Sequence, residues 1–421
     1  MDFSLNEEQK QIKALIRDFS KREVDQARMT EILRKNDATK NIEAIRANYP
    51  HDLVEKAHNA GLRTIGIPTK YGGPGPDKNQ SVTMAVALEE AGYSAGLAAQ
   101  LLLGPEDGFA IQAMRRNPYA TEEEREATFA RWLQYSREMG HGTVSEPAGS
   151  VDIHLPYDEG GDQILQVTAH KDGDEWVING DKMFCSNGAV IDAVTVFART
   201  KEGPISESAS TFRLRADTPG VSRTLNRLIF TDFGGNCQYN YDNVRVPESA
   251  LVGRLHGAYR NLAYTFQYKW QVRSHGVGLL LRLYEHMHEF AKQRVAGGRP
   301  IIQHTNIAAK LGDLAMHLES LRSLHYRVAW ETDQMEEAGV PPPPLGNWYW
   351  YQTFLIYLKQ VSFRFFEAAH DIYGSVASSD DLPLEGILRY NLHMRAAPLP
   401  PDMGLIRACW DYDTRFYYQT Y

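Results

Sequence analysis

The order of hydrophobic periodicities along the chain constrains its fold more than any single motif. Helical spacing of apolar residues, which predicts helices with one buried face, occurs first in residues 6–34, 51–60, 81–103 and 122–137. After Gly140 the pattern changes to short alternating segments separated by Gly and Asp, which is typical of strands. Helical spacing then returns in residues 277–294, 305–332 and 348–373. Because helices and strands form separate blocks, the pattern favours separate domains over an alternating parallel sheet.

With 421 residues, the chain is too long for one ordinary hydrophobic core. We therefore expect a multidomain α+β protein with three parts. These are an N-terminal helical domain in residues 1–140, a central β domain in residues 141–255, and a C-terminal bundle of long helices in residues 256–421.

Charge and cysteine content exclude several classes of function. The formal net charge is −8 and no long run of Lys or Arg is present, so we expect no nucleic-acid partner. Cys185, Cys237 and Cys409 are far apart and lack metal-type spacing, which indicates a reducing compartment and no metal site. No targeting segment or membrane-spanning apolar stretch is found, so we expect a cytoplasmic protein without a membrane span.

Two motifs indicate a binding site in the β domain. The first is Ser145-Glu-Pro-Ala-Gly-Ser150, a turn whose small residues allow a ligand to approach the backbone. The second, in residues 176–188, predicts a hairpin with the aromatic Phe184 and the hydroxyl of Ser186 at its far end. Each residue also has an ordinary structural role open to it, since Ser145 suits a turn and Phe184 suits a core.

Together with further segments in the same order along the chain, these motifs resemble the acyl-CoA dehydrogenase family nearly end to end. The further segments are Gly61-Leu-Arg-Thr-Ile-Gly-Ile-Pro, Tyr241-Asp-Asn-Val-Arg-Val-Pro247, Gln293-Arg294 with Gly298-Arg-Pro-Ile, Asp371-Ile-Tyr-Gly374 and Leu382-Pro-Leu-Glu-Gly-Ile-Leu-Arg389. The resemblance implies a β-barrel-like central domain, a C-terminal four-helix bundle and FAD as the cofactor. It also implies α,β-dehydrogenation of an acyl-CoA or related thioester, with an electron-transfer flavoprotein as the acceptor.

The resemblance also implies roles for residues in the β domain. Val144 and Ser145 would contact the flavin ring, and Ser150 would complete the same cofactor-binding turn. Phe184 would pack on the ring as a flat apolar wall. Ser186 would donate a hydrogen bond near flavin N5, where the reduced ring accumulates charge.

A second group of cofactor-binding residues is implied in the C-terminal domain. Arg294 matches an arginine that reaches the FAD pyrophosphate of a neighbouring subunit, and its forked guanidinium suits a diphosphate. A homodimer or a homotetramer is therefore expected. Asp371 and Gly374 would lie near the same pyrophosphate, although Asp371 stands where the family often has a glutamine. Two negative charges there would repel unless Asp371 turns away.

The catalytic base is where the sequence departs from the family. Relatives need a carboxylate to remove the α-proton of the thioester, yet the matching position here is Pro398, and the position used by other relatives is Tyr268. The segment 395–407 contains one carboxylate, Asp402, which we take as the candidate catalytic base with Arg407 nearby. Asp402 also suits a turn or a helix cap. Two alternatives stay open, namely an oxidase or flavin monooxygenase on the same fold, and a catalytically inactive partner subunit.

Overall fold

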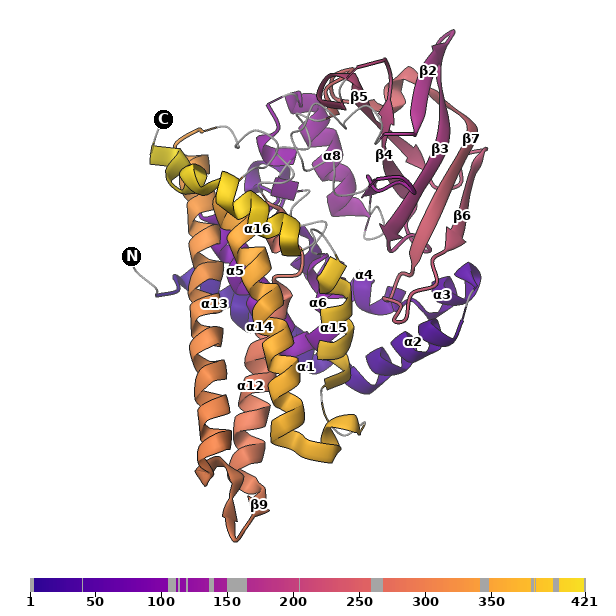
Figure 1. The fold of residues 1–421 in the computed structure, drawn as a ribbon. Coiled ribbons are helices and arrows are strands. Elements are labelled where there is room, and N and C mark those ends of the chain that lie inside the picture. The colour runs from indigo at the N-terminus through magenta and orange to yellow at the C-terminus, as the bar shows by residue number, and fades with distance from the viewer. Residues whose placement is uncertain are drawn as a thin grey trace.

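The fold is described from a computed structural model, which is largely helical with a single large sheet (Figure 1). The structure describes residues 4–39, 41–104, 111–112, 114–118, 120–135, 140–149, 165–203, 205–258, 268–340, 348–379, 382, 384–396 and 401–419.

The N-terminal region consists of helices. They are α1 (Glu7–Glu23), α2 (Gln26–Ala38), α3 (Ile42–Asn48), α4 (His51–Asn59), α5 (Gln80–Ala95), α6 (Ala99–Leu103) and α8 (Glu122–Gln134). Of these, α1, α2, α3 and α8 begin at side-chain caps. The single helix predicted over residues 6–34 is in fact two helices. Val24 adopts an extended backbone, and the Asp25 side chain accepts a hydrogen bond from Arg28 N to start α2. Helical spacing is present on both sides of this break, which is why the prediction continued through it.

The strands form one mixed sheet of eight strands. They are β1 (Gly140–Thr143), β2 (Thr168–Asp172), β3 (Glu175–Ser186), β4 (Ala193–Arg199), β5 (Ala209–Arg215), β6 (Val221–Leu225), β7 (Asn236–Pro247) and β8 (Leu251–Val252). The order is β6-β7-β3-β2-β4-β5-β8, with β1 parallel to β4. Inward-facing residues such as Ile178, Val194, Phe212 and Val244 make one buried core. A short helix, α10 (Ile205–Ser208), precedes β5.

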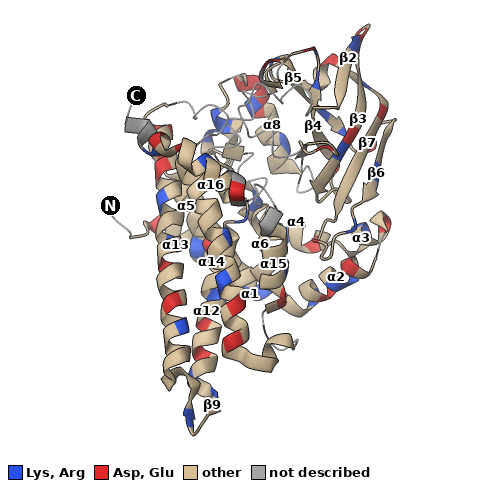
Figure 2. Cartoon of the chain, viewed as in Figure 1, with Lys and Arg blue, Asp and Glu red and all other residues tan. Residues whose placement is uncertain are grey.

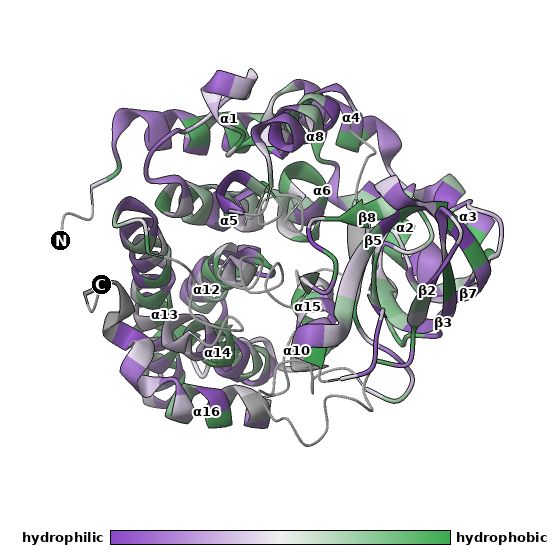
Figure 3. Cartoon of the chain, turned by 90° about the horizontal axis from the view of Figure 1, so that it is seen from above, coloured by the Kyte–Doolittle hydropathy of each residue, from purple (hydrophilic) through white to green (hydrophobic). Residues whose placement is uncertain are grey.

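Long helices make up the C-terminal region. They are α12 (His275–Gln293), α13 (Thr305–Glu337), α14 (Tyr349–Tyr373) and α15 (Leu384–Ala396), which form the bundle, and α16 (Pro401–Trp410), which packs on α14. A small hairpin of β9 (Val295–Ala296) and β10 (Arg299–Pro300) joins α12 to α13 at one end of the bundle (Figure 1). Seen from above in Figure 3, the sheet lies to one side of the bundle. The predicted fold class is confirmed.

Close contact between α5 and α12 joins the N-terminal region to the bundle. A Cβ added at Gly92 would lie 1.8 Å from the backbone O of His275, and one added at Gly278 would lie 1.9 Å from that of Glu89. Only glycine permits this approach, because any larger residue would force the helices apart. Both contacts pack α5 closely against α12 at the start of the bundle.

Charges of both signs are interspersed along the helices in the view of Figure 2. Within the described ranges, no helix is both long and apolar enough to span a membrane. In the same part of the chain, no three His, Cys, Asp or Glu side chains gather as a metal site.

Candidate active site

A β-bulge in β3 creates the most unusual surface feature of the sheet. Lys182 pairs with Tyr239 and Cys185 pairs with Cys237, so two residues of β3 stand opposite the single residue Gln238 of β7. A bulge of this kind re-aims a side chain and is common beside active sites. Lys182 and Cys185 are both buried, and of the two residues between them Phe184 is turned outward.

The exposure and the backbone conformation of Phe184 are typical of a ligand-binding residue. Its side chain is 56% exposed, although the side chain is large and apolar. Its backbone adopts φ +56°, a left-handed conformation that is strained for a residue with a Cβ. Strain of this kind persists where the surrounding structure enforces it, and such positions cluster at functional sites.

The turn after β1 lies directly beside this bulge. Met183 N donates a hydrogen bond to Ser145 O at 2.8 Å, and Glu146 forms an isolated bridge with Gly149. Ser186, two residues past Phe184, is half-buried, and its hydroxyl has no hydrogen-bond partner among the residues that the structure describes. The structure therefore brings Val144, Ser145, Phe184 and Ser186 into one neighbourhood, whereas Ser150 lies outside the described residues.

The residue types at this place fit a planar aromatic cofactor such as flavin. An exposed phenyl ring supplies an apolar face, and the Ser186 hydroxyl is a neutral donor available to a ring nitrogen. The adjacent turn presents backbone groups that small ligands commonly bind. Val144, Ser145, Phe184 and Ser186 are all uncharged, which agrees with a site that accepts a neutral ring system.

Arg294, Asp371 and Gly374 form a separate group at the other end of the bundle. Arg294 ends α12 immediately before the β9–β10 hairpin, and Asp371 and Gly374 lie at the end of α14. Phe290 and Tyr373 join these two helix ends, with ring centroids 4.9 Å apart. In Figure 1 the hairpin lies at the foot of the bundle, remote from the β domain. One protomer therefore does not bring both predicted groups together.

Asp371 is ion-paired, which reduces the repulsion expected between its carboxylate and a cofactor phosphate. Lys310 Nζ lies 2.7 Å from Asp371 Oδ2. Both side chains are exposed, so this pair contributes little to stability. Its consequence is electrostatic, because the lysine offsets the negative charge that Asp371 would otherwise present to a phosphate. Gly374 adopts φ +64° at the end of α14, and a Cβ there would meet open space.

Asp402 lies in the first turn of α16. Its side chain is exposed and makes no hydrogen bond or ion pair with the described residues. Arg407 does not serve it, because Arg407 Nη2 bonds Asp411 Oδ1 at 2.7 Å and both are buried. Burial raises the pKa of Asp411 to about 6, and the charge of Arg407 opposes that shift. Pro398 lies outside the described residues.

Tyr268 is fully buried and takes no exposed position. Its hydroxyl accepts a hydrogen bond from Arg116 Nη1 at 3.1 Å. A phenol held by a guanidinium is a poor substitute for a carboxylate base, because it must lose its proton before it can accept one. Asp402 therefore stays the candidate base.

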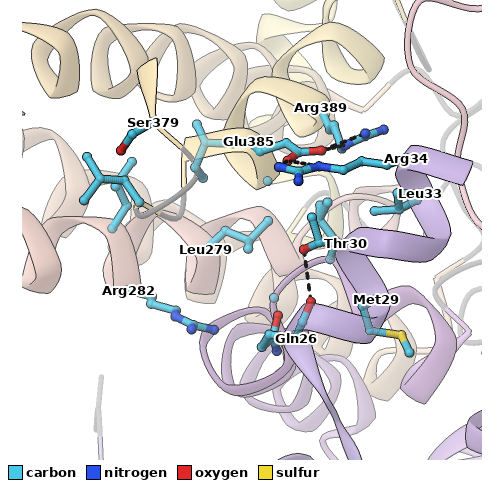
Figure 4. A pocket seen from close by; sticks show the side chains of 16 residues that line it. Gln26, Met29, Thr30, Leu33, Arg34, Leu279, Arg282, Ser379, Glu385 and Arg389 are labelled. Atoms are coloured by element: carbon cyan, nitrogen blue, oxygen red, sulfur yellow. Dashed lines mark hydrogen bonds and ion pairs between the residues drawn. The ribbon is translucent and has the colours of Figure 1, made fainter. Parts of the chain in front are cut away.

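A cavity of about 180 Å³ lies between α2, α12 and α15, apart from the predicted residues (Figure 4). Glu385 joins two arginines across it, with Arg34 Nη2 at 2.6 Å and Arg389 Nη2 at 2.8 Å. Arg389 also bonds Asp37 at 2.5 Å, and it is 3% exposed. This network fixes α15 to α2. The cavity contains none of the predicted cofactor-binding residues, so it is not part of the candidate site.

Sequence reasoning missed one buried pair behind the bulge, Lys182 with Glu146. The sequence did indicate such a pair, because a lysine at an inward-facing position of a strand, among apolar inward-facing residues, needs a partner of opposite charge. Burial lowers the pKa of Lys182, and the Glu146 carboxylate opposes that shift.

Three family models match the chain in succession. They are the acyl-CoA dehydrogenase N-terminal domain over residues 6–136, the middle domain over 145–236, and the C-terminal domain over 268–397. An acyl-CoA dehydrogenase of Bacillus subtilis (strain 168) is 29% identical over 333 residues, which cover 77% of this chain and 79% of that protein.

Solved structures show the same fold. The glutaryl-coenzyme A dehydrogenase in its glutaryl-CoA complex aligns with a TM-score of 0.79 at 19% identity, covering 99% of this chain and 97% of that one. The prolyl acyl carrier protein oxidase AnaB aligns with a TM-score of 0.78 at 20% identity, covering 97% and 99%. Since the three domain models follow one another along most of its length, this chain belongs to the acyl-CoA dehydrogenase family of FAD-dependent oxidoreductases.

Proposed function

We propose that the protein removes two hydrogens from the α and β carbons of an acyl-CoA or related thioester, with Asp402 as the base. The observation that carries the proposal is the exposed, strained Phe184 beside the Ser145 turn, in a chain of this family. When bound, FAD supplies the acceptor for the hydride that leaves the β carbon. The Asp402 carboxylate takes the α-proton, and the electron pair left behind forms the carbon–carbon double bond.

Apart from Asp402, the chain's residues hold and shield the site rather than react. Phe184 covers one face of the cofactor and excludes water there. Ser186 donates a hydrogen bond to a ring nitrogen, and the Ser145 turn supports the ring edge. Arg294 of the partner subunit binds the pyrophosphate, which explains its distance from Phe184 within one protomer.

Two partners complete the proposed reaction. An electron-transfer flavoprotein accepts the electrons, and a second copy of the chain completes each cofactor site. The homo-oligomer is a dimer or a tetramer of dimers. Support comes from the distance between the two groups of predicted cofactor-binding residues. One group lies in the β domain and the other at the foot of the bundle, and one protomer does not bring them together.

An oxidase on the same fold is the second candidate. It is favoured by the likeness to the prolyl acyl carrier protein oxidase AnaB, whose name refers to an acyl carrier protein rather than to coenzyme A. The replacement of the family's catalytic residue by Pro398 favours it too, because proline has no N–H to polarise a thioester carbonyl.

Anaerobic titration of the FAD-saturated protein with acyl-CoA and acyl-carrier thioesters tests the proposal. Bleaching of the flavin band by one of them is expected, and rapid oxygen consumption after admission of air would select the oxidase. Asp402→Asn should lower the rate of bleaching by at least about 100-fold with FAD still bound. The matched control is Asp413→Asn, since Asp413 is fully exposed in the same C-terminal segment. Full activity of Asp402→Asn would remove Asp402 from the mechanism.

A further inference from the structure

A lysine and a glutamate form a completely buried ion pair behind the bulge. Lys182 Nζ lies 2.7 Å from Glu146 Oε1, and the two side chains are 0% and 1% exposed. Removing two charges from water is costly unless several hydrogen bonds compensate. Apolar residues of similar volume would often serve stability equally well, so stability alone does not account for this pair.

The remaining bonds of the pair go to the segments that surround the cofactor-binding turn. Lys182 Nζ also donates to Val144 O at 3.2 Å. The Glu146 carboxylate accepts from Val167 N at 3.1 Å and from Gln166 N. One residue farther along β3, Met183 N donates to Ser145 O. The turn and the bulge are therefore tied to each other from behind.

The pair adjoins both predicted flavin-contacting segments in the sequence. Glu146 follows Ser145 directly, and Lys182 stands two residues before Phe184. Lys182 and Cys185 both face inward, so the chain between them must arch outward. A lysine fixed at the start of this arch determines where the exposed phenyl ring is presented.

We propose that Lys182 and Glu146 are positioning residues, which hold the Ser145 turn and the Phe184 bulge in the FAD-binding arrangement before the cofactor arrives. The inference rests on the flavin-contacting roles proposed above for Ser145 and Phe184. Neither Lys182 nor Glu146 needs to touch the cofactor, because both side chains are buried inside the β domain and act through the backbone groups that they bond.

Three variants test the proposal against a matched control. Lys182→Met keeps the aliphatic stem without the charge, Glu146→Gln keeps the shape, and the double variant leaves no unpaired buried charge. The control is Lys171→Met, which removes an exposed pair with Glu248 elsewhere on the same sheet. FAD dissociation constants come from flavin fluorescence quenching, with the visible flavin spectrum as a second readout and circular dichroism to verify folding.

Each variant at the buried pair should bind FAD at least about tenfold more weakly, with a shifted flavin band, whereas the control stays within about twofold. A folded double variant with the wild-type dissociation constant and spectrum would overturn the inference alone. A wild-type protein that binds no FAD would overturn both the flavin site and the inference.

Hydrogen exchange of the wild-type apoprotein gives a result that does not depend on the variants folding. The amides of Val167 and Met183 should already be protected before FAD is added, because the pair holds their acceptors in place. Protection that appears only after FAD binds would show that the cofactor, and not the ion pair, organises the turn.

Discussion

Replacing Phe184 by glycine should weaken FAD binding strongly while the apoprotein stays nearly as stable. Just over half of the side chain, 56%, is exposed. Taking the exposed part as on the order of 100 Å² and the hydrophobic term as about 25 cal/mol per Å², covering it with flavin contributes about 2.5 kcal/mol. Losing that contribution corresponds to a rise of about 70-fold in the FAD dissociation constant.

The stability of the apoprotein follows from opposing terms at the same residue. The buried part of the side chain contributes about 2 kcal/mol, which glycine forfeits. Glycine also relieves a left-handed backbone that costs about 1–2 kcal/mol with any side chain, at an entropic cost of about 0.5–1 kcal/mol. The free energy of unfolding should therefore fall by only about 1 kcal/mol. By contrast, Phe212→Ala in the core of the same sheet should cost about 3–5 kcal/mol.

The assays are urea unfolding of the apoprotein and FAD titration of both variants. A loss near that of Phe212→Ala would mean that Phe184 is an ordinary core residue. An unchanged FAD dissociation constant would mean that the bulge does not face the cofactor. Either result would refute the assignment of this surface.

Three further perturbations have expected outcomes. Arg294→Gln should weaken FAD binding, and co-expression with Phe184→Gly should restore strong binding at some sites of the mixed oligomer, because such a site combines Phe184 of one subunit with Arg294 of the other. If binding is not restored, Arg294 acts within its own subunit. Burial raises the pKa of Asp333 to about 6, so the folded state binds this proton more tightly than the unfolded state, and the free energy of unfolding should fall as pH rises from about 4 to about 6. Urea unfolding at each pH should show a smaller fall for Asp333→Asn than for the wild type. Arg389→Lys should lower the free energy of unfolding by about 2 kcal/mol, because an ammonium cannot fork between the carboxylates of α2 and α15; a thermal melt unchanged from wild type would contradict this.

Asp333 also shows how a tertiary contact completes a local element. Helix α5 begins after Asn79, whose side chain makes no capping bond. Instead, the Asp333 carboxylate from α13 accepts from Ser81 N at 2.9 Å and Val82 N at 3.0 Å. The sequence offers Asn79 as the N-cap and cannot reveal the actual acceptor, because Asp333 is 252 residues away from Ser81 in the chain.

The sequence by itself determined the class of the fold, the order of its parts and the family. Those features depend on periodicity and on short motifs, which near neighbours in the chain encode. The same local information indicated strand structure that ends at Phe184 and Ser186, and with it FAD. The predicted hairpin in residues 176–188 was wrong, because residues Glu175–Ser186 form the single strand β3, which pairs with the distant strand β7.

Only the tertiary structure decided which side chains meet. Lys182 and Glu146 are 36 residues apart, and Lys310 and Asp371 are 61 apart, yet each pair is in contact. The bulge that turns Phe184 outward depends on the register between β3 and β7, and Arg407 pairs with Asp411 where packing buries both side chains. Such choices are made when distant segments pack, because a buried charge must then find whichever partner the fold brings within reach.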